Sequence, residues 1–402
     1  MPEAAPHPPS FVERGAVWLL GGAAVGLASG LASALFLFGL ERVTRTRETT
    51  VLWLPWLLPL AGLALGWVKQ RSGAPAARGT ALVLEAAGDG APVPARLGLF
   101  ALLGTWWTHL FGGSAGREGA AVQLGGVLAD ALALRSPRLR AHRSDLVLCG
   151  IAAGFGSVFG TPLAGALFAL EVVAPGRLVW TRAPACLWAA VVADAVARAV
   201  GTTHSVYPRV EPVDLSPHAL LGWLALALAV ALTVRAFLFA AHGVSALLER
   251  TVRLPMLRPF VGGGAVVALW LLAQSSDYFG LGVPGILRAA STAEVPPFAF
   301  AWKLAFTACT VGSGFLGGEV TPLFFIGAHL GHTLAGPLGL PVVAASVVAL
   351  AALFGAAARS PLALAVMAFE LSGPEVLPYA LAVGLIATWL CGRQRLYQGQ
   401  LP

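Results

Sequence analysis

A charge-free stretch of 25 residues runs from residue 16 to residue 40. A hydrocarbon core about 30 Å thick is crossed by a helix of about 20 apolar residues. The whole chain is 57% hydrophobic and 11% charged, whereas a soluble domain has about a quarter of its residues charged. Further apolar runs cover residues 51–68, 215–234, 259–276 and 376–392. We therefore predict an all-α polytopic membrane protein whose surroundings are the lipid bilayer.

Several other apolar segments are interrupted by glycine or proline, for example residues 119–134, 146–170 and 320–358. We expect about ten or more helical segments, of which several are too short to cross a membrane alone.

The net charge of +7 comes mostly from arginines in short loops between apolar runs. Basic loops of this kind follow the positive-inside rule, so a nucleic-acid partner is not expected. On this rule we place two loops together on the cytoplasmic side, which are the loops that carry Arg42, Arg45 and Arg47 and, further on, Arg135, Arg138, Arg140 and Arg143.

The N-terminus and the cysteines offer no further chemistry. Residues 1–12 lack a basic region before an apolar core, so we expect a disordered tail and not a cleaved signal. The four cysteines are isolated, and neither they nor the eight histidines show metal-ligand spacing. We predict no metal and no cofactor.

The two halves of the chain repeat each other. The segment GTPLAGALFALE ends at Glu171, and RSPLALAVMAFE ends at Glu370 with proline and leucine at matching positions. Upstream, a second set of residues recurs at an offset of 201, namely Gly116, Glu118 and Gly126 as Gly317, Glu319 and Gly327. Repeats of broken apolar helices are typical of transporters. We predict membrane repeats at residues 13–210 and 211–402, with an ion or substrate site at 113–120 and 314–322.

A glycine-rich turn that opens a helix suits an anion. The first N–H groups of a helix are unpaired and carry the positive end of its dipole. Glu118 in such a turn can occupy the anion site as a tethered competitor and can leave it when protonated. The alternative is a structural ion pair between Glu118 and Arg117, and Ser114 has the alternative role of a helix cap. We interpret Glu171 and Glu370 as structural groups that satisfy helix ends or subunit contacts.

Four stretches of the chain resemble the CLC family of anion channels and anion/proton antiporters. They are GSAGREGAAVQLGG, GFGSVFGTPLAGALFALE, GSGFLGGEVTPLF and the LYQ near the C-terminus. The resemblance covers about residues 15 to 400. It implies a homodimer with one pore per subunit, two inverted repeats of broken helices, a gating glutamate at Glu118 and an anion-coordinating tyrosine at Tyr397.

The departures from the family pattern resemble its fluoride-exporting branch. Thr80 stands near the serine of the first anion motif, and Glu319 stands where chloride transporters have an apolar residue. Val320 replaces a phenylalanine, and we find no inner proton glutamate near Thr203. The resemblance thus implies a proton-coupled fluoride exporter of a bacterial-type inner (plasma) membrane. A chloride/proton antiporter or a passive anion channel on the same fold is the alternative.

Fluoride is small and strongly hydrated, so its site must offer good hydrogen-bond donors. We assign anion binding to Thr80, Gly119, Val320 and Tyr397 through hydroxyl and backbone N–H groups, and proton coupling and gating to Glu118 and Glu319.

A rival class, an intramembrane hydrolase, would need a nucleophile such as Ser114 or Ser157 beside a base, and no GxSxG or HExxH supports it. We therefore predict that the protein is not an enzyme. No role is assigned to Asp194, Arg235 or His332.

Overall fold

The computed structural model describes residue 15 and residues 17–72, 78–89, 92–213 and 216–401. The predicted tail at residues 1–12 lies outside these ranges. Helices account for nearly all regular structure in the described ranges, and the one isolated bridge there pairs Gly116 with Gly318. The prediction of an all-α protein is confirmed.

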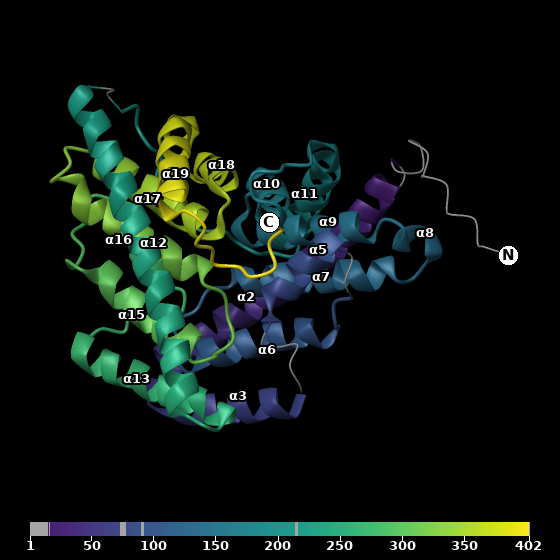
Figure 1. Ribbon diagram of the computed structural model, residues 1–402, viewed down its shortest axis with the longest axis horizontal. Coiled ribbons are helices and arrows are strands. Elements are labelled where there is room, and N and C mark those ends of the chain that lie inside the picture. Colours follow the sequence, from purple (N-terminus) through teal and green to yellow (C-terminus); the bar gives the residue numbers. More distant parts are fainter. Residues whose placement is uncertain (1–14, 16, 73–77, 90–91, 214–215, 402) are drawn as a thin grey trace.

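The first half begins with a long helix and continues with shorter ones (Figure 1). Its helices are α2 (Gly22–Arg45), α3 (Leu58–Ser72), α5 (Thr80–Asp89), α6 (Arg96–Leu110), α7 (Glu118–Ala133), α8 (Pro137–Arg140), α9 (Arg143–Phe159), α10 (Pro162–Val173) and α11 (Ala183–Ala199).

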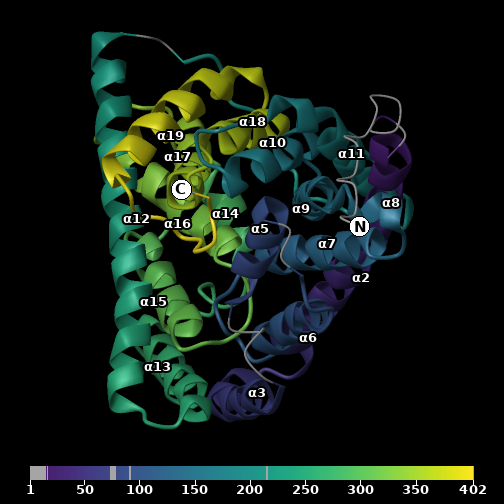
Figure 2. The same ribbon diagram turned by 45° about the vertical axis from the view of Figure 1, so that its right-hand side comes forward.

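The second half begins with the longest helix, which runs along one edge of the molecule (Figure 2). Its helices are α12 (Pro217–Thr251), α13 (Arg258–Ala273), α14 (Val283–Ala289), α15 (Ala299–Gly312), α16 (Val320–Ala335), α17 (Val342–Ala358), α18 (Pro361–Ser372) and α19 (Leu377–Cys391).

Proline and serine fix several of the helix starts. Proline is tolerated in the first helical turn because its missing N–H has no intrahelical partner there. Pro162 and Pro361 begin α10 and α18 at matching positions of the two halves. Pro217 begins α12 behind Ser216, whose side chain accepts a hydrogen bond from the Ala219 N–H at 3.3 Å.

Four helical stretches are long and apolar enough to cross a membrane, namely Val17–Thr50, Pro217–Thr251, Pro255–Ala273 and Pro374–Cys391. Shorter apolar helices such as Pro162–Val173 and Pro361–Ser372 are packed inside the protein. This mixture confirms the expectation of several segments too short to cross alone. Short helices at membrane depth need protein around their ends, because hydrocarbon cannot satisfy the free backbone groups.

The two halves are inverted with respect to each other, as α10 and α18 show. Glu171, near the end of α10, accepts hydrogen bonds from the N–H groups of Leu362 and Ala363 in the first turn of α18, at 3.2 and 2.8 Å. The reverse pair is also present, because Glu370 near the end of α18 accepts from Leu163 and Ala164 at 3.0 and 2.8 Å. Each carboxylate satisfies the helix start of the other half, which confirms the structural interpretation of both glutamates.

The predicted placement of both arginine-rich loops on one side of the membrane is wrong. Gly21, just before α2, lies against Leu146 in the first turn of α9, and the Ser33 hydroxyl accepts from Ser157 further along both helices at 2.8 Å. The two helices therefore run parallel, so Arg143 lies at the start of α2. Arg42 lies at its other end, about 30 Å away at 1.5 Å per residue.

We call the end of the molecule with Arg135, Arg138, Arg140 and Arg143 the arginine-rich face, and the end with Arg42 and Arg45 the opposite face. The start of α6 also belongs to the arginine-rich face, since Asp130 accepts hydrogen bonds from both the Val93 N–H and Arg143. The positive-inside rule favours the arginine-rich face as the cytoplasmic one. The spacing of charges in the sequence could not reveal this, because it does not give the direction of each helix.

Candidate functional site

The two glycine-rich turns meet at the centre of the protein. The Gly116 N–H donates to the Gly318 oxygen at 2.5 Å, and the Gly318 N–H donates to the Gly116 oxygen at 2.9 Å. This close approach requires glycine, because a Cβ atom on Gly318 would lie 2.8 Å from the Gly119 nitrogen. The bridge brings the N-termini of α7 and α16 together, one from each half.

Glu118 is fully buried at this meeting point. One carboxylate oxygen accepts from the backbone N–H of Arg117 at 3.1 Å and from that of Thr321 at 3.2 Å. The other accepts from the Thr321 hydroxyl and lies 3.4 Å from the Arg117 Nε. An ionised carboxylate is acceptor-only, and all four of these groups are donors.

The Glu118 carboxylate therefore sits on the N-terminus of α16, where a helix favours an anion. The ion pair with Arg117, which was the alternative interpretation, is present as well. Arg117 alone does not account for the position, because half of the donors come from Thr321 in the other half of the chain.

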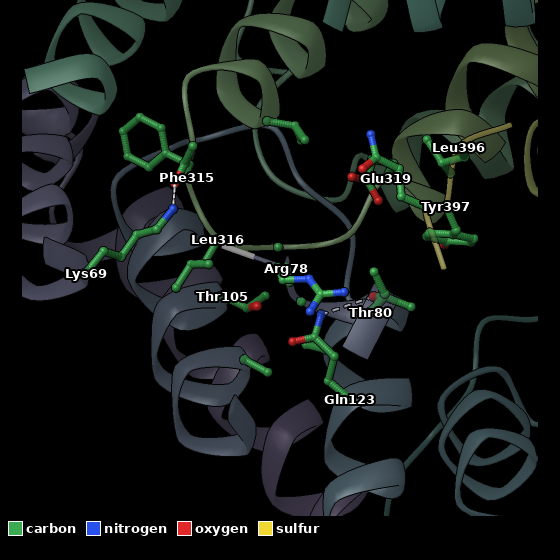
Figure 3. A pocket seen from close by; sticks show the side chains of 18 of the residues that line it. Lys69, Arg78, Thr80, Thr105, Gln123, Phe315, Leu316, Glu319, Leu396 and Tyr397 are labelled. Atoms are coloured by element: carbon green, nitrogen blue, oxygen red, sulfur yellow. Dashed lines mark hydrogen bonds between the residues drawn. The ribbon is translucent and has the colours of Figure 1, made fainter. Parts of the chain in front are cut away.

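Glu319 is placed quite differently. It precedes the first residue of α16, and its side chain forms no hydrogen bond or ion pair with another described residue. Instead, Glu319 lines a cavity of about 420 Å³ together with Thr80 and Tyr397 (Figure 3). Lys69 and Arg78 also line it. Lys69 and Arg78 belong to segments that reach the arginine-rich face, because Arg96 at the start of α6 donates to the Ser72 oxygen at the end of α3, and Ser144 at the start of α9 donates to the Ala87 oxygen of α5. We call the cavity the arginine-face cavity.

The predicted anion-binding residues come together beside Glu118. Thr80, Gly119, Val320 and Tyr397 line one narrow pocket with the Glu118 side chain. Tyr397 is 7% exposed, and its hydroxyl has no hydrogen-bond partner among the described residues. Since Thr80 and Tyr397 line both the pocket and the arginine-face cavity, the cavity leads towards Glu118.

Two contributors were missed in the sequence. Thr321 supplies two donors to Glu118, as described above. Gln123 donates to the Thr80 hydroxyl oxygen at 3.1 Å, so the Thr80 O–H hydrogen is free for a ligand. Gln123 could have been found from helix spacing, because it lies four residues after Gly119 on α7. Nothing in the sequence pairs Thr321 with Glu118, because that contact joins the two halves.

A second cavity, of about 500 Å³, lies on the other side of Glu118. It is lined by Arg117 and by residues at the far end of α2, including Glu41 and Arg45, so we call it the opposite-face cavity. Thr203 lies in its wall. Glu319 lines the arginine-face cavity and Thr203 the opposite-face cavity, so the two residues face different cavities.

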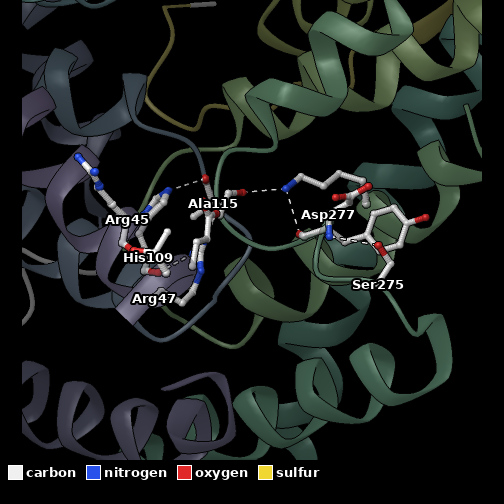
Figure 4. A network of polar contacts seen from close by, with 11 residues as sticks. Arg45, Arg47, His109, Ala115, Ser275 and Asp277 are labelled. Atoms are coloured by element: carbon white, nitrogen blue, oxygen red, sulfur yellow. Dashed lines mark hydrogen bonds and ion pairs between the residues drawn. The ribbon is translucent and has the colours of Figure 1, made fainter. Parts of the chain in front are cut away.

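Buried cations fasten the loop before the first turn (Figure 4). Arg47 donates to the His109 carbonyl oxygen at 2.7 Å, and the His109 ring contacts the carbonyl oxygens of Thr105 and Ala115 at 2.8 and 3.0 Å. Lys303, also fully buried, donates to the Gly280 oxygen at 2.7 Å. These bonds hold the turn in place behind Glu118.

Some polar residues have partners that the sequence did not suggest. Ser114 does not cap α7, which has no side-chain cap; its hydroxyl pairs with that of Thr307 at 2.9 Å. Asp194 forms an ion pair with Arg198 at 2.8 Å, and His332 contacts the Ala289 oxygen at 2.9 Å. Within the described ranges, no group of three His, Cys, Asp or Glu residues is placed to hold a metal.

This architecture defines a class of membrane protein. Inverted halves, broken helices that meet at the centre, and two cavities separated by a carboxylate on a helix N-terminus are features of an ion-transport protein. The protein family described as "Voltage gated chloride channel" matches residues 61–392 of the chain. The chain belongs to this family, the CLC family of the resemblance above.

Individual relatives agree with this assignment. The chain is 42% identical over 393 residues to a "Chloride/fluoride channel protein" of Pseudomonas syringae pv. tomato, covering 96% of this chain and 86% of the relative. It is 32% identical to a "Putative chloride channel protein ClcB-like" of Ralstonia nicotianae, with 86% and 85% covered. A solved "CLC-type fluoride/proton antiporter" superposes with a TM-score of 0.93 at 32% identity, covering 98% of this chain and 99% of that one.

Proposed function

We propose that the protein exports fluoride in exchange for protons across a bacterial inner membrane. The observation that carries the proposal is the Glu118 carboxylate seated on the N-terminus of α16 between two cavities. The similarity to a solved fluoride/proton antiporter supports the choice of ions.

The mechanism follows from competition for one set of donors. Ionised Glu118 occupies the N–H groups that an anion needs, and it holds the pocket closed to fluoride. Protonation removes the charge, so the side chain is released and fluoride can take its place. Fluoride approaches from the arginine-face cavity through the donors Thr80 and Tyr397, while the proton reaches Glu118 from the side of Arg117.

Glu319 has the role of a second proton carrier. Its side chain forms no hydrogen bond or ion pair with another described residue and lines the cavity that Thr80 and Tyr397 also line. Two carboxylates near one anion path repel each other when both are ionised, which favours a proton on one of them. A passive channel would have no use for such a second carboxylate.

The test is coupled flux in liposomes that contain the purified protein. Vesicles loaded with potassium fluoride are diluted into fluoride-free buffer, and a fluoride electrode and a pH electrode are read together. We expect fluoride efflux to drive proton uptake against a proton gradient. Fluoride flux without proton uptake would indicate a passive channel, and equal coupled flux of chloride would indicate a chloride/proton antiporter.

The homodimer implied by the family resemblance is part of the proposal, as is the absence of enzymatic activity. The number of subunits is tested by photobleaching of singly labelled protein at low density in liposomes, where two bleaching steps are expected and a single step would contradict a dimer. Against a hydrolase, the hydroxyls of Ser114 and Ser157 bond to Thr307 and Ser33 and not to a histidine.

A further inference from the structure

The C-terminal strap, residues 394–401, connects the two halves of the protein beside the anion pocket. It follows α19 and passes the arginine-face cavity, where Leu396 and Tyr397 form part of the wall (Figure 3). The Leu396 N–H donates to the Ala357 oxygen near the end of α17, and the Leu401 N–H donates to the carbonyl oxygen of the last residue of α10, both at 2.8 Å. Tyr397 therefore lies on a segment that is anchored to a different half at each end.

Gln400, in this strap, bridges both halves with one amide group. It is 4% exposed, and its Nε2 atom donates to the Val172 oxygen of α10 and to the Ala358 oxygen of α17, each at 2.9 Å. Both carbonyls belong to the last turn of their helix, where no intrahelical N–H is available to them. An amide nitrogen has two N–H donors, so both are used in this bridge. Gln400 thus holds the strap to the ends of two helices at once.

The Tyr397 hydroxyl depends on such anchors for its position. It has no hydrogen-bond partner among the described residues, so its place in the pocket beside Glu118 is set by the packing of its ring and by the backbone of the strap. Gly399 brings the strap close to α5, because a Cβ atom on this glycine, whose φ is +98°, would lie 2.8 Å from the Ala81 oxygen. Ala81 follows Thr80, the other predicted hydroxyl donor. The strap therefore sets how the hydroxyls of Tyr397 and Thr80 face one anion.

We propose that Gln400 is a positioning residue for fluoride transport, which holds the Tyr397 hydroxyl where it can donate to the anion by bridging α10 and α17. Gln400 lines neither the pocket at Glu118 nor either cavity, so it acts through Tyr397 and not on the ion itself. The inference rests on the proposed function, because it takes Tyr397 as a donor to fluoride. A side chain that only capped the two helix ends would stabilise the protein without a specific effect on fluoride binding.

The test is a double-mutant cycle, in which the purified protein is titrated calorimetrically with potassium fluoride. Gln400→Met keeps the length of the side chain and removes both donors. We expect roughly tenfold weaker fluoride binding, the lower end of the range for one hydrogen bond to a charged group, because the Tyr397 hydroxyl is displaced but not removed. In the Tyr397→Phe background, which has no hydroxyl to displace, Gln400→Met should cause no further weakening.

Two controls separate positioning from stability. Gln394→Met makes the same substitution at an exposed residue of the strap, whose side chain has no bond to another described residue, and it should bind fluoride as the parent does. Thermal unfolding is followed in all the proteins of the cycle, since lower stability alone would weaken binding equally in both backgrounds. Gln400→Asn keeps the amide on a shorter side chain and should weaken binding less, so it takes the place of Gln400→Met in the cycle if that variant does not fold.

Two results would overturn the inference. One is a fluoride affinity that is unchanged in both Gln400→Met and Gln400→Asn. The other is a weakening by Gln400→Met that is equal with and without the Tyr397 hydroxyl. Either result leaves the proposed function intact if the parent protein carries out coupled fluoride transport in liposomes. Conversely, the expected coupling between Gln400 and Tyr397 in a protein that shows no proton-coupled flux contradicts the proposed function alone.

Discussion

The two glycine-rich turns have one sequence pattern but hold their glutamates in different ways. Glu118 is fully buried and receives four donors, whereas Glu319 forms no bond with another described residue and faces a cavity. Part of the difference arises at the residue two positions after each glutamate. At the offset of 201 that relates the turns, Thr321 corresponds to Ala120, so α16 offers Glu118 a hydroxyl that α7 cannot offer Glu319.

A repeated sequence thus supplies the meeting point, and two unrepeated side chains make the two positions unequal, because Arg117 corresponds to Gly318 and Thr321 to Ala120. A proton-coupled exchanger needs its two carboxylates to be bonded differently, because two carboxylates with equal bonding would compete for the same protonation state. The predictions below change one of the two glutamates or the residues around it.

The largest effect on coupled transport is expected from Glu118→Gln. A neutral amide cannot ionise or carry a proton, so fluoride-driven proton uptake should be abolished in the liposome assay. Glu294→Gln, in an exposed loop, is the matched control and should behave as the parent protein. Proton pumping that persists in Glu118→Gln would show that the coupling group lies elsewhere.

Glu319→Gln removes the second carboxylate and leaves the first in place. We expect slower fluoride transport, or fluoride transport with a reduced number of protons for each ion, because one proton carrier is lost. The fold should be intact, since the Glu319 side chain bonds to its own backbone and to no other described residue. Size-exclusion chromatography checks the fold, and the paired electrodes measure the ratio. A well-folded variant with the parent ratio and rate would leave Glu319 without a transport role.

Thr80→Val and Tyr397→Phe remove donors that line both the pocket at Glu118 and the cavity that Glu319 faces. Each keeps the shape and loses an O–H group, at a cost of about 1.5–3 kcal/mol for a bond to a charged group. This corresponds to roughly 10- to 150-fold weaker fluoride binding. Isothermal titration with potassium fluoride measures it. Parent-like affinity in both variants would exclude these hydroxyls as ligands.

Thr321→Val makes the surroundings of the Glu118 carboxylate more like those of Glu319. Glu118 would lose one of its four donors, so its hold on the N-terminus of α16 weakens and fluoride competes more easily. We expect about tenfold tighter fluoride binding, the low end of the value for one bond to a charged group, because three donors remain. Thr321→Ser keeps the hydroxyl and should match the parent. Weaker binding in Thr321→Val would mean that the hydroxyl serves the anion and not Glu118.

Much of this site could be anticipated from the sequence, for a physical reason. Membrane depth restricts the chain to helices, and glycines beside glutamates at helix starts identify the anion site locally. The contact of Thr321 with Glu118 and the partner of Ser114 could not be predicted, because each joins residues about 200 positions apart. The error over the arginine loops has the same origin, since it concerns how helices from different segments run past each other.

The smallest effect on coupled transport is expected at Glu171 and Glu370, where the two halves remain equivalent. Each carboxylate accepts two backbone N–H bonds from the helix start of the other half. A glutamine has one acceptor oxygen, so Glu171→Gln and Glu370→Gln lose the charge, worth about 0.3–1 kcal/mol at a helix N-terminus. They also lose one of the two accepted bonds and leave a backbone N–H facing the new amide group, at a cost of about 1–3 kcal/mol. Both should lower the unfolding temperature, with Glu171→Gln the larger effect because Glu171 is the more buried of the two. Both should keep the parent ratio of protons to fluoride, because neither side chain lines the path between the cavities. Thermal unfolding in detergent and the paired electrodes measure these quantities. A loss of coupling in either variant would show that proton transfer extends to the symmetric part of the molecule, and that the inequality of the two turns is not sufficient for exchange.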